Sequence, residues 1–329
     1  MNYTIINADC FEEIKNFADN SIDLIITSPP YSDIISYGKN IDVKKSTEYV
    51  DWILPLFNEI YRVLKPSGSF ILNINDNCSG GYRNTFIYEL IYRSSKETKL
   101  KFYDTYIWHK KNGIPNGANK RFRNTTEFIF HFCKDNKLMK FYIDRVLEEA
   151  KDKDKKTQQY PKAQSNFENG IRTHNTILRK PKDKVRPDNV FRFATAGASR
   201  DNTIKHPAPF NKELPQYFIN LLTDEGDIVM DTFGGIMTSG LAAKSLNRNF
   251  IGIELNEKYA EFGEKRINGD LLDIYEVCQY DMDDNLIACY KNRMEASKAT
   301  GIDDGDIMRT YNRTKFNSRG GYKWKLKQK

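Results

Sequence analysis

The tetrapeptide Ser28-Pro29-Pro30-Tyr31 follows a largely apolar run, residues 22–26, that is typical of a buried strand. Two prolines lack N–H groups and fix the backbone, so this segment ends a strand and its carbonyls point in defined directions. In such a loop the serine hydroxyl and the next carbonyl can accept hydrogen bonds from an exocyclic NH2, while the tyrosine stacks on the ring. The pattern indicates a binding site for a flat ring that carries an amino group. The alternative is a rigid turn that only ends a strand.

A second candidate lies in the βαβ pattern of residues 227–254. The first strand ends in Asp231, a glycine-rich turn opens a helix, and the second strand ends in Glu254. Glycine there permits close backbone approach to a nucleotide, and an acid at the second strand end can accept hydrogen bonds from ribose hydroxyls. Gly234, Gly235 and Gly240 do not form a GxGxxG, which counts against a dinucleotide site. A plain structural turn is the alternative.

The elements around these two motifs alternate between strand and helix. The patterns predict helices over 47–64, 84–95, 214–222, 241–247 and 256–267, and strands over 3–9, 69–74, 102–109, 127–133, 227–231 and 250–254. This alternation indicates an α/β fold with a doubly wound, mostly parallel sheet. In such folds ligands bind at the carboxyl ends of the strands, where both motifs are expected.

The formal charge of +7 is unevenly distributed. Residues 309–329 carry eight basic residues and no acid, so the rest of the chain sums to −1. A second basic stretch, residues 134–186, has 15 Lys or Arg against 8 Asp or Glu, and its surroundings from about 134 to 205 show no clear periodicity. We interpret 134–205 as an insertion of loops outside the sheet. Basic segments on an acidic body favour a polyanion such as nucleic acid as partner, with solvated segments as the alternative.

Several classes of protein are disfavoured. No apolar run approaches the roughly 20 residues of a membrane helix, and the N-terminus lacks the pattern of a secretory signal. Five scattered cysteines without a CxxC pair count against a disulfide framework and a structural zinc site, and they are expected to be small buried or half-buried residues. We therefore expect a cytoplasmic protein without a metal.

Thr27–Tyr31 resembles the (D/N/S)PP(Y/F) motif of amino-group DNA methyltransferases, which use S-adenosylmethionine. Other segments resemble the remaining motifs of that family in order: Asn7-Ala8-Asp9-Cys10, Trp108–Asn112 with Pro115, Asn124–Ile129, His206–Phe210 with Leu214, Asp231–Gly235 and Phe250–Glu254. The catalytic motif comes first and the cofactor motif last, which resembles the β-type arrangement. This order counts against RNA and protein methyltransferases that share a related loop.

The resemblance implies a Rossmann-like class I methyltransferase fold in four parts. These are a catalytic half, 1–133; a target-recognition insertion, 134–205; a cofactor-binding half, 206–270; and an extension with a basic tail, 271–329. It also implies methyl transfer to the amine of a base flipped out of double-stranded DNA. The residues that it implies are catalytic Ser28, Pro29, Pro30 and Tyr31, and cofactor-binding Asp9, Cys10, Phe210, Asp231, Phe233, Gly235 and Glu254.

The chain departs from the family pattern in the cofactor turn. Thr232 stands where proline is usual, and residues 236–239 read Ile-Met-Thr-Ser in place of the common Ser-Gly-Thr-Thr. Met237 thus replaces the second glycine, where its side chain could crowd the methionine end of the cofactor. A degenerate methylase that binds DNA or cofactor without turnover is therefore an alternative to the enzyme.

Within the family, serine before the two prolines mostly accompanies cytosine N4 as target, so Ser28 favours N4 over the alternative, adenine N6. No cysteine follows a proline, which counts against cytosine C5 methylation. The resemblance further implies a restriction–modification system with a possible cognate endonuclease as functional partner. It implies a monomer or a homodimer.

Overall fold

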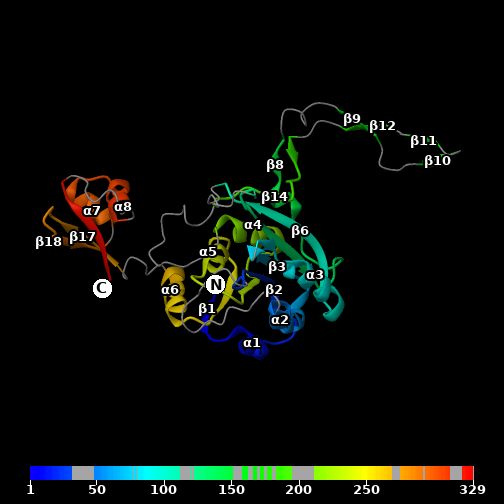
Figure 1. Ribbon diagram of the computed structural model, residues 1–329, viewed down its shortest axis with the longest axis horizontal. Coiled ribbons are helices and arrows are strands. Elements are labelled where there is room, and N and C mark those ends of the chain that lie inside the picture. The colour runs from blue at the N-terminus through cyan, green and yellow to red at the C-terminus, as the bar shows by residue number, and fades with distance from the viewer. Residues whose placement is uncertain are drawn as a thin grey trace. The chain divides into compact units, whose positions relative to one another are not determined.

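The computed structural model describes residues 1–31, 48–76, 78–79, 81–111, 120, 122–150, 158–161, 166–168, 171–173, 176–179, 183–194, 211–268, 275–291, 293–311 and 321–328. It contains two compact units, Met1–Leu255 and Asn256–Lys329, and each is described by itself. Figure 1 shows the elements in sequence order by colour.

The first unit contains an eight-stranded sheet. Its spatial order is β1 (Tyr3–Asn7), β16 (Asn249–Glu254), β15 (Ile228–Asp231), β2 (Ile22–Thr27), β3 (Leu64–Ile74), β7 (Thr126–Cys133), β6 (Lys101–His109) and β14 (Val190–Phe191). All neighbours pair in parallel except β7, which is antiparallel to both β3 and β6. The predicted doubly wound, mostly parallel sheet is confirmed.

Helices cover both faces of this sheet (Figure 1). One face packs against α1 (Cys10–Glu13), the 3-10 turn η1 (Ile14–Asn16), α2 (Tyr49–Val63) and α3 (Phe86–Glu97), and there Phe57 of α2 lies 5.2 Å from Phe70 of β3, ring centre to ring centre. The other face packs against α4 (Glu213–Leu222) and α5 (Thr238–Ser245), with Phe218 of α4 5.4 Å from Tyr106 of β6. β2 is buried along its whole length because both layers cover it.

Residues 134–205 contain more regular structure than the sequence indicates. After η2 (Ile143–Val146), three antiparallel pairs follow one inside the other: β8 (Glu148–Glu149) with β13 (Lys184–Val185), β9 (Gln158–Pro161) with β12 (Thr176–Arg179), and β10 (Asn166–Glu168) with β11 (Ile171–Thr173). β14 then joins the main sheet beside β6. The prediction of loops was wrong for these strands, because strands of two to four residues are too short to show a periodicity. The prediction that the segment lies outside the main sheet was wrong for β14, whereas the three pairs form sheets of their own. Another short pair, β4 (Cys78–Ser79) with β5 (Tyr82–Arg83), precedes α3.

The second unit begins with α6 (Glu257–Asn268) and has a small sheet of its own. The sheet has the antiparallel order β18 (Leu286–Tyr290), β17 (Tyr275–Tyr280), β19 (Lys323–Gln328) and packs on α7 (Arg293–Thr300) and α8 (Asp304–Tyr311). Val277, Ala296, Ile307 and Trp324 form its core. The end of the basic tail is thus strand β19, while residues 312–320 lie outside the described part.

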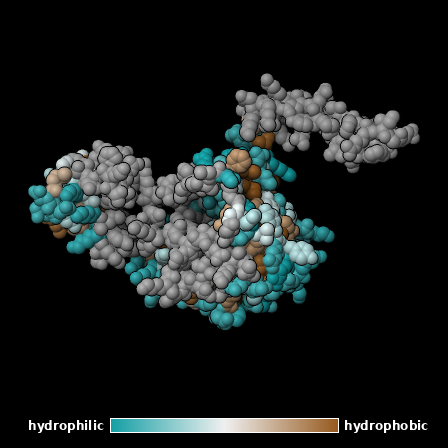
Figure 2. Space-filling model, viewed as in Figure 1, coloured by the Kyte–Doolittle hydropathy of each residue, from teal (hydrophilic) through white to brown (hydrophobic). Residues whose placement is uncertain are grey.

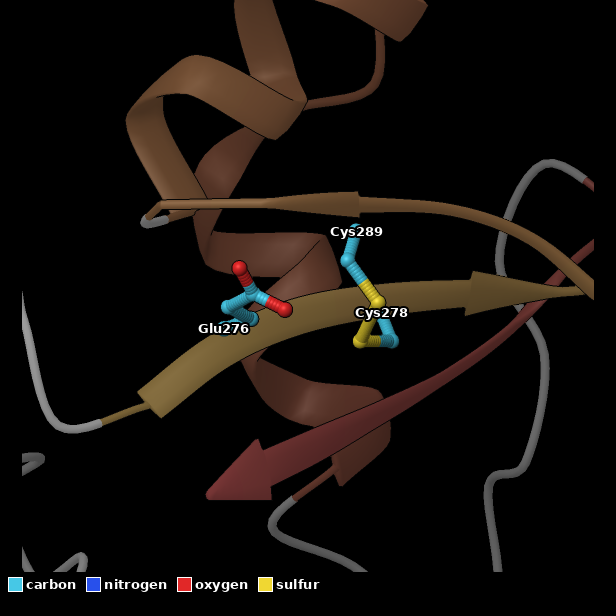
Figure 3. Close-up of side chains that lie close together, drawn as sticks. All are labelled: Glu276, Cys278 and Cys289. Atoms are coloured by element: carbon cyan, nitrogen blue, oxygen red, sulfur yellow. A yellow bond between two sulfur atoms is a disulfide. The ribbon is translucent and has the colours of Figure 1, made fainter. Parts of the chain in front are cut away.

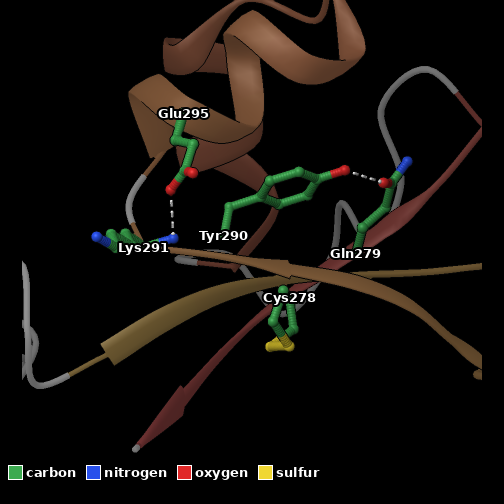
Figure 4. The surroundings of a disulfide bond; sticks show 6 residues. Cys278, Gln279, Tyr290, Lys291 and Glu295 are labelled. Atoms are coloured by element: carbon green, nitrogen blue, oxygen red, sulfur yellow. Dashed lines mark hydrogen bonds between the residues drawn. A yellow bond between two sulfur atoms is a disulfide. The ribbon is translucent and has the colours of Figure 1, made fainter.

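Two of the five cysteines form a disulfide in this unit. Cys278 and Cys289 lie directly opposite each other on β17 and β18 and are bonded (Figure 3). The carboxylate of Glu276 lies within 4.8 Å of the two sulfur atoms. Figure 4 shows the disulfide on one face of the strands, and Tyr290, whose hydroxyl donates to Gln279 Oε1 at 3.0 Å, on the face toward α7.

The prediction against disulfides did not hold for this pair, since it took no account of the hairpin register that places them side by side. It holds for Cys10 and Cys133, which are free and buried, whereas Cys78 is free and exposed.

On the face drawn in Figure 2, most of the described surface is hydrophilic. Among the described residues, no helix combines the length and the apolar character that a membrane crossing requires.

Candidate active site at the ends of β2 and β15

Strands β2 and β15 are parallel neighbours, although about 200 residues separate them in the chain. Leu24 pairs with Val229 and Ile25 with Met230, so both strands end at the same edge of the sheet. There the Thr27 hydroxyl donates to Asp231 Oδ1 at 2.6 Å, and the Phe233 amide donates to Thr27 Oγ1 at 3.1 Å. The residue before the Ser-Pro-Pro-Tyr loop is therefore bonded directly to the glycine-rich turn.

Asp231 is the buried centre of this junction. Only 2% of the residue is exposed, and burial raises the pKa of its carboxyl. Besides the Thr27 hydroxyl, it accepts the Phe233 amide at 3.1 Å and the Ser239 hydroxyl. Three donors, from the end of β2, the turn and α5, use both carboxylate oxygens, so Asp231 holds the site together. The sequence placed Asp231 in the site but not this coupling to Thr27.

The turn after β15 is fixed by β16. The Gly234 amide donates to the Ile253 carbonyl at 2.8 Å, and the Gly235 amide donates to Glu254 Oε2 at 2.7 Å. Glu254 is half-buried at the end of its strand. A carboxylate accepts several hydrogen bonds, so Glu254 can bond this amide and still accept hydroxyl groups from a ligand.

Met237, the residue that departs from the family pattern, is fully buried and has a φ of 57°. This left-handed conformation favours glycine, which explains in physical terms why glycine is common at that place. A Cβ added at Gly234 would lie 2.6 Å from the Met237 sulfur, and one added at Gly252 would lie closer still. The side chain therefore packs inside the protein against these two glycines.

Asp9 and Cys10 lie at the same sheet edge. β1 pairs with β16, and Asn7 lies opposite Glu254. Asp9 is exposed and caps α1, because its Oδ1 accepts the Phe11 amide at 2.9 Å. Cys10 is buried, which raises the pKa of its thiol, and the nearby Asp9 carboxylate raises it further.

A group of half-buried aromatic rings flanks the turn. Phe233 lies 6.0 Å from Trp52 of α2 and 6.5 Å from Phe11 of α1, and those two rings are 5.3 Å apart. Phe233 was predicted from the sequence, but Trp52 and Phe11 were not. Phe210, the remaining predicted cofactor residue, lies outside the described residues.

The Ser-Pro-Pro-Tyr loop is held by side chains from other elements. Tyr49 of α2 donates its hydroxyl to the Pro30 carbonyl at 3.0 Å. The Ser28 hydroxyl donates to the Tyr31 hydroxyl at 3.2 Å, which donates in turn to Glu127 Oε2 at 2.8 Å. Tyr31 is only 7% exposed. The loop is thus anchored at Pro30 and at Tyr31.

Glu127 collects further donors beside the loop. The Asn73 side-chain amide donates to Oε2 at 3.0 Å, and the Lys110 ammonium lies 2.5 Å from Oε1. These residues were not predicted as site residues. Glu127 and Lys110 do fall in the segments 124–129 and 108–112 that resemble family motifs, which is the signal that could have found them. Asn73 and Tyr49 carry no such signal.

Comparison with known proteins identifies the family. A family model described as DNA methylase matches residues 22–265. The chain is 27% identical over 270 residues to type II methyltransferase M.HpaI of Haemophilus parainfluenzae, covering 82% of this chain and 76% of the relative. It is 31% identical over 268 residues to DNA adenine methyltransferase YhdJ of Escherichia coli (strain K12), covering 80% and 82%.

Solved structures agree with this result. The PvuII DNA methyltransferase (cytosine-N4-specific) matches with a TM-score of 0.59 and 25% identity, over 80% of this chain and 87% of that one. A DNA modification methylase of Thermus thermophilus, solved in complex with S-adenosyl-L-methionine, shares the fold with a TM-score of 0.52 and 19% identity, over 82% and 96%. Both motifs lie where β2 and β15 adjoin, which is the switch point at which the order of the strands reverses. This position agrees with the match over residues 22–265, and the chain belongs to the DNA methylase family.

Proposed function

We propose that the chain is a site-specific DNA methyltransferase that transfers a methyl group from S-adenosylmethionine to the exocyclic amine of a flipped base, with cytosine N4 as the target. The observation that carries the proposal is the Thr27–Asp231 hydrogen bond of 2.6 Å. It joins a loop that can hold an amine to a turn that can hold a nucleoside. Two bound reactants would therefore meet in one fixed geometry, which is the main requirement for direct group transfer.

The residues of the turn fit the cofactor. Glu254 can accept the ribose hydroxyls, and the half-buried rings of Phe233 and Trp52 offer apolar surface to the adenine. Asp9 and Cys10 lie beside Glu254 at the same edge. When bound, the cofactor supplies a methyl group on a sulfonium.

The loop would act on the target amine. Ser28 Oγ and the Pro29 carbonyl accept the two N–H groups and align the nitrogen with the incoming methyl. The ring of Tyr31 stacks on the base. Because Tyr31 is only 7% exposed, the base must displace the groups that cover it.

The choice of base rests on the loop and on the relatives. Ser28 favours cytosine N4, and the PvuII methyltransferase is described as cytosine-N4-specific. Adenine N6 is the second candidate, since the relative YhdJ, 31% identical, is described as a DNA adenine methyltransferase.

Residues 134–205 are proposed to read double-stranded DNA. Their lysines and arginines can contact phosphates, and asparagine, glutamine and arginine residues of this segment can read base edges in the major groove. The relative M.HpaI is a type II methyltransferase, which supports a restriction–modification system with a cognate endonuclease as functional partner.

The test uses the purified chain, unmodified double-stranded DNA and S-adenosylmethionine with a labelled methyl group. The DNA is digested to nucleosides, which are separated by chromatography and identified by mass spectrometry. Labelled N4-methylcytosine is the expected product, and labelled N6-methyladenine would correct the base. Calorimetric titration with the cofactor should show binding. Binding without any labelled product would instead indicate a degenerate methylase that binds without turnover.

A further inference from the structure

We infer that Glu127 is a positioning residue that acts on the target amine through Tyr31 and Ser28. Two successive hydrogen bonds connect its carboxylate to the hydroxyl that is proposed to hold the amine. The inference rests on the proposed function and adds a residue to its machinery.

The direction of the two bonds gives the chain of residues its effect. Each hydroxyl has one proton: Ser28 gives its proton to Tyr31, and Tyr31 gives its own to Glu127. Ser28 Oγ therefore presents only lone pairs to a third group, which is the arrangement that an N–H donor requires. Successive hydrogen bonds polarise one another, so the negative charge of Glu127 strengthens Ser28 as an acceptor.

The carboxylate at the end of this chain is itself fixed. Glu127 is 7% exposed and begins the buried part of β7, which pairs with β3 and β6. Asn73 holds Oε2 from β3, and Lys110 balances the charge at Oε1. The Lys110 amide donates to the Thr125 carbonyl at 2.7 Å, which keeps the lysine beside β7. A carboxylate held by several donors cannot follow small movements of the loop, so it can set the position of the Tyr31 hydroxyl.

The arrangement compensates for a difference within the motif. Loops that begin with aspartate carry a carboxylate at the place of Ser28, next to the amine. Here that place is neutral, and a carboxylate lies two hydrogen bonds away. The 3.2 Å between Ser28 Oγ and the Tyr31 oxygen is long, and such bonds often shorten when substrate is bound.

The experiment measures kcat and KM of methyl transfer to DNA, cofactor Kd by calorimetry, and Tm. The variants are Tyr31→Phe, which keeps the ring, Glu127→Gln, which keeps the shape, and the double variant. The control is Tyr106→Phe. Tyr106 is also 7% exposed, and its hydroxyl forms a hydrogen bond of 3.3 Å with His131, which is not a residue of the loop. We expect kcat to fall about ten-fold in each single variant, as for a hydrogen bond to a charged group. The kcat of the double variant should be no lower than that of the single variants, because both changes interrupt the same series of hydrogen bonds.

Cofactor Kd and KM for DNA should change less than about two-fold, and the control should keep its kcat. Unchanged kcat in Tyr31→Phe, multiplying losses in the double variant, or losses that fall on KM and Kd would each overturn the inference while the wild type still methylates DNA. If Glu127→Gln does not fold, Tyr31→Phe against Tyr106→Phe decides. A wild-type chain without methyl transfer would refute the proposed function itself, and the inference with it.

Discussion

The two loops that meet at the switch point are built in different ways. The turn after β15 is fixed through its own backbone: the Gly234 amide donates to the Ile253 carbonyl, the Gly235 amide donates to the Glu254 carboxylate, and Met237 has a left-handed conformation. The Ser-Pro-Pro-Tyr loop is fixed by side chains that come from other elements, above all Tyr49 and Glu127.

The difference indicates how the two halves would share the reaction. A turn with a backbone frame suits a ligand that always has the same shape, as a cofactor does. A loop held by side chains from α2, β3 and β7 can be adjusted by single substitutions without a change of fold. Asp231 connects the loop and the turn through its hydrogen bonds. The following substitutions test the loop and the turn separately.

The largest effect is expected for Asp231→Ala. The change leaves the Thr27 and Ser239 hydroxyls without their acceptor in a buried place, and the Phe233 amide loses one of its two acceptors. We expect a loss of about 3 kcal/mol in the free energy of unfolding, together with weaker cofactor binding and slower turnover. Urea unfolding, calorimetry and kcat measure the three. Asp104→Ala, an exposed aspartate of β6, serves as control, and a variant that loses only one of the two functions would show that the loops are not coupled here.

Ser28→Ala should affect the loop alone. Loss of the acceptor for the amine is expected to lower kcat about 100-fold, as for the removal of one group that stabilises a transition state. Cofactor Kd should change less than about two-fold, because the Ser28 hydroxyl bonds Tyr31 of its own loop and not a residue of the turn. Equal losses in kcat and cofactor affinity would mean that the loop is only structural.

Met237→Gly should affect the turn alone. Relief of the left-handed conformation, about 1 kcal/mol, is smaller than the loss of a fully buried methionine, so we expect about 2 kcal/mol of destabilisation. Gly252→Ala should also destabilise, because its Cβ would clash with the Met237 sulfur. In the double variant the clash with Met237 is absent and only the contact with the Phe250 ring remains, so urea unfolding should show less than the sum of the two losses. Strictly additive losses would contradict the described packing.

A further prediction concerns pH and β7, the strand that carries Glu127. Burial lowers the pKa of His131 to about 3, so the folded chain keeps this histidine neutral while the unfolded chain binds a proton below about 6.5. The contribution to stability is therefore present above pH 6.5 and is lost as the pH falls toward 3, by up to about 1.4 kcal/mol per pH unit. We measure the free energy of unfolding in urea at several pH values between about 7.5 and 4.5. It should fall less steeply with falling pH in His131→Gln than in the wild type. An equal slope would place the histidine in a different environment.

The sequence predicts the parts of this molecule that depend on local patterns. The apolar run before Pro29, the glycines after Asp231 and the periodicity of α2 and α4 all gave elements that the structure confirms. Tyr49, Asn73 and Glu127 could not be assigned to the loop in this way, because Glu127 lies 96 residues from Tyr31 and meets it only when β7 pairs with β3. The same reason applies to β14 and to the disulfide, which depend on strand register.

We propose that the junction of the two loops methylates an amine at a defined DNA sequence. It is tested most directly by expressing the full chain in a host without DNA methylation and sequencing the host DNA by a modification-sensitive method, with Ser28→Ala as the matched control. We expect one short motif that is fully modified at cytosine N4 with the wild type and unmodified with the variant. Soluble wild-type protein that leaves no mark on the DNA would contradict it.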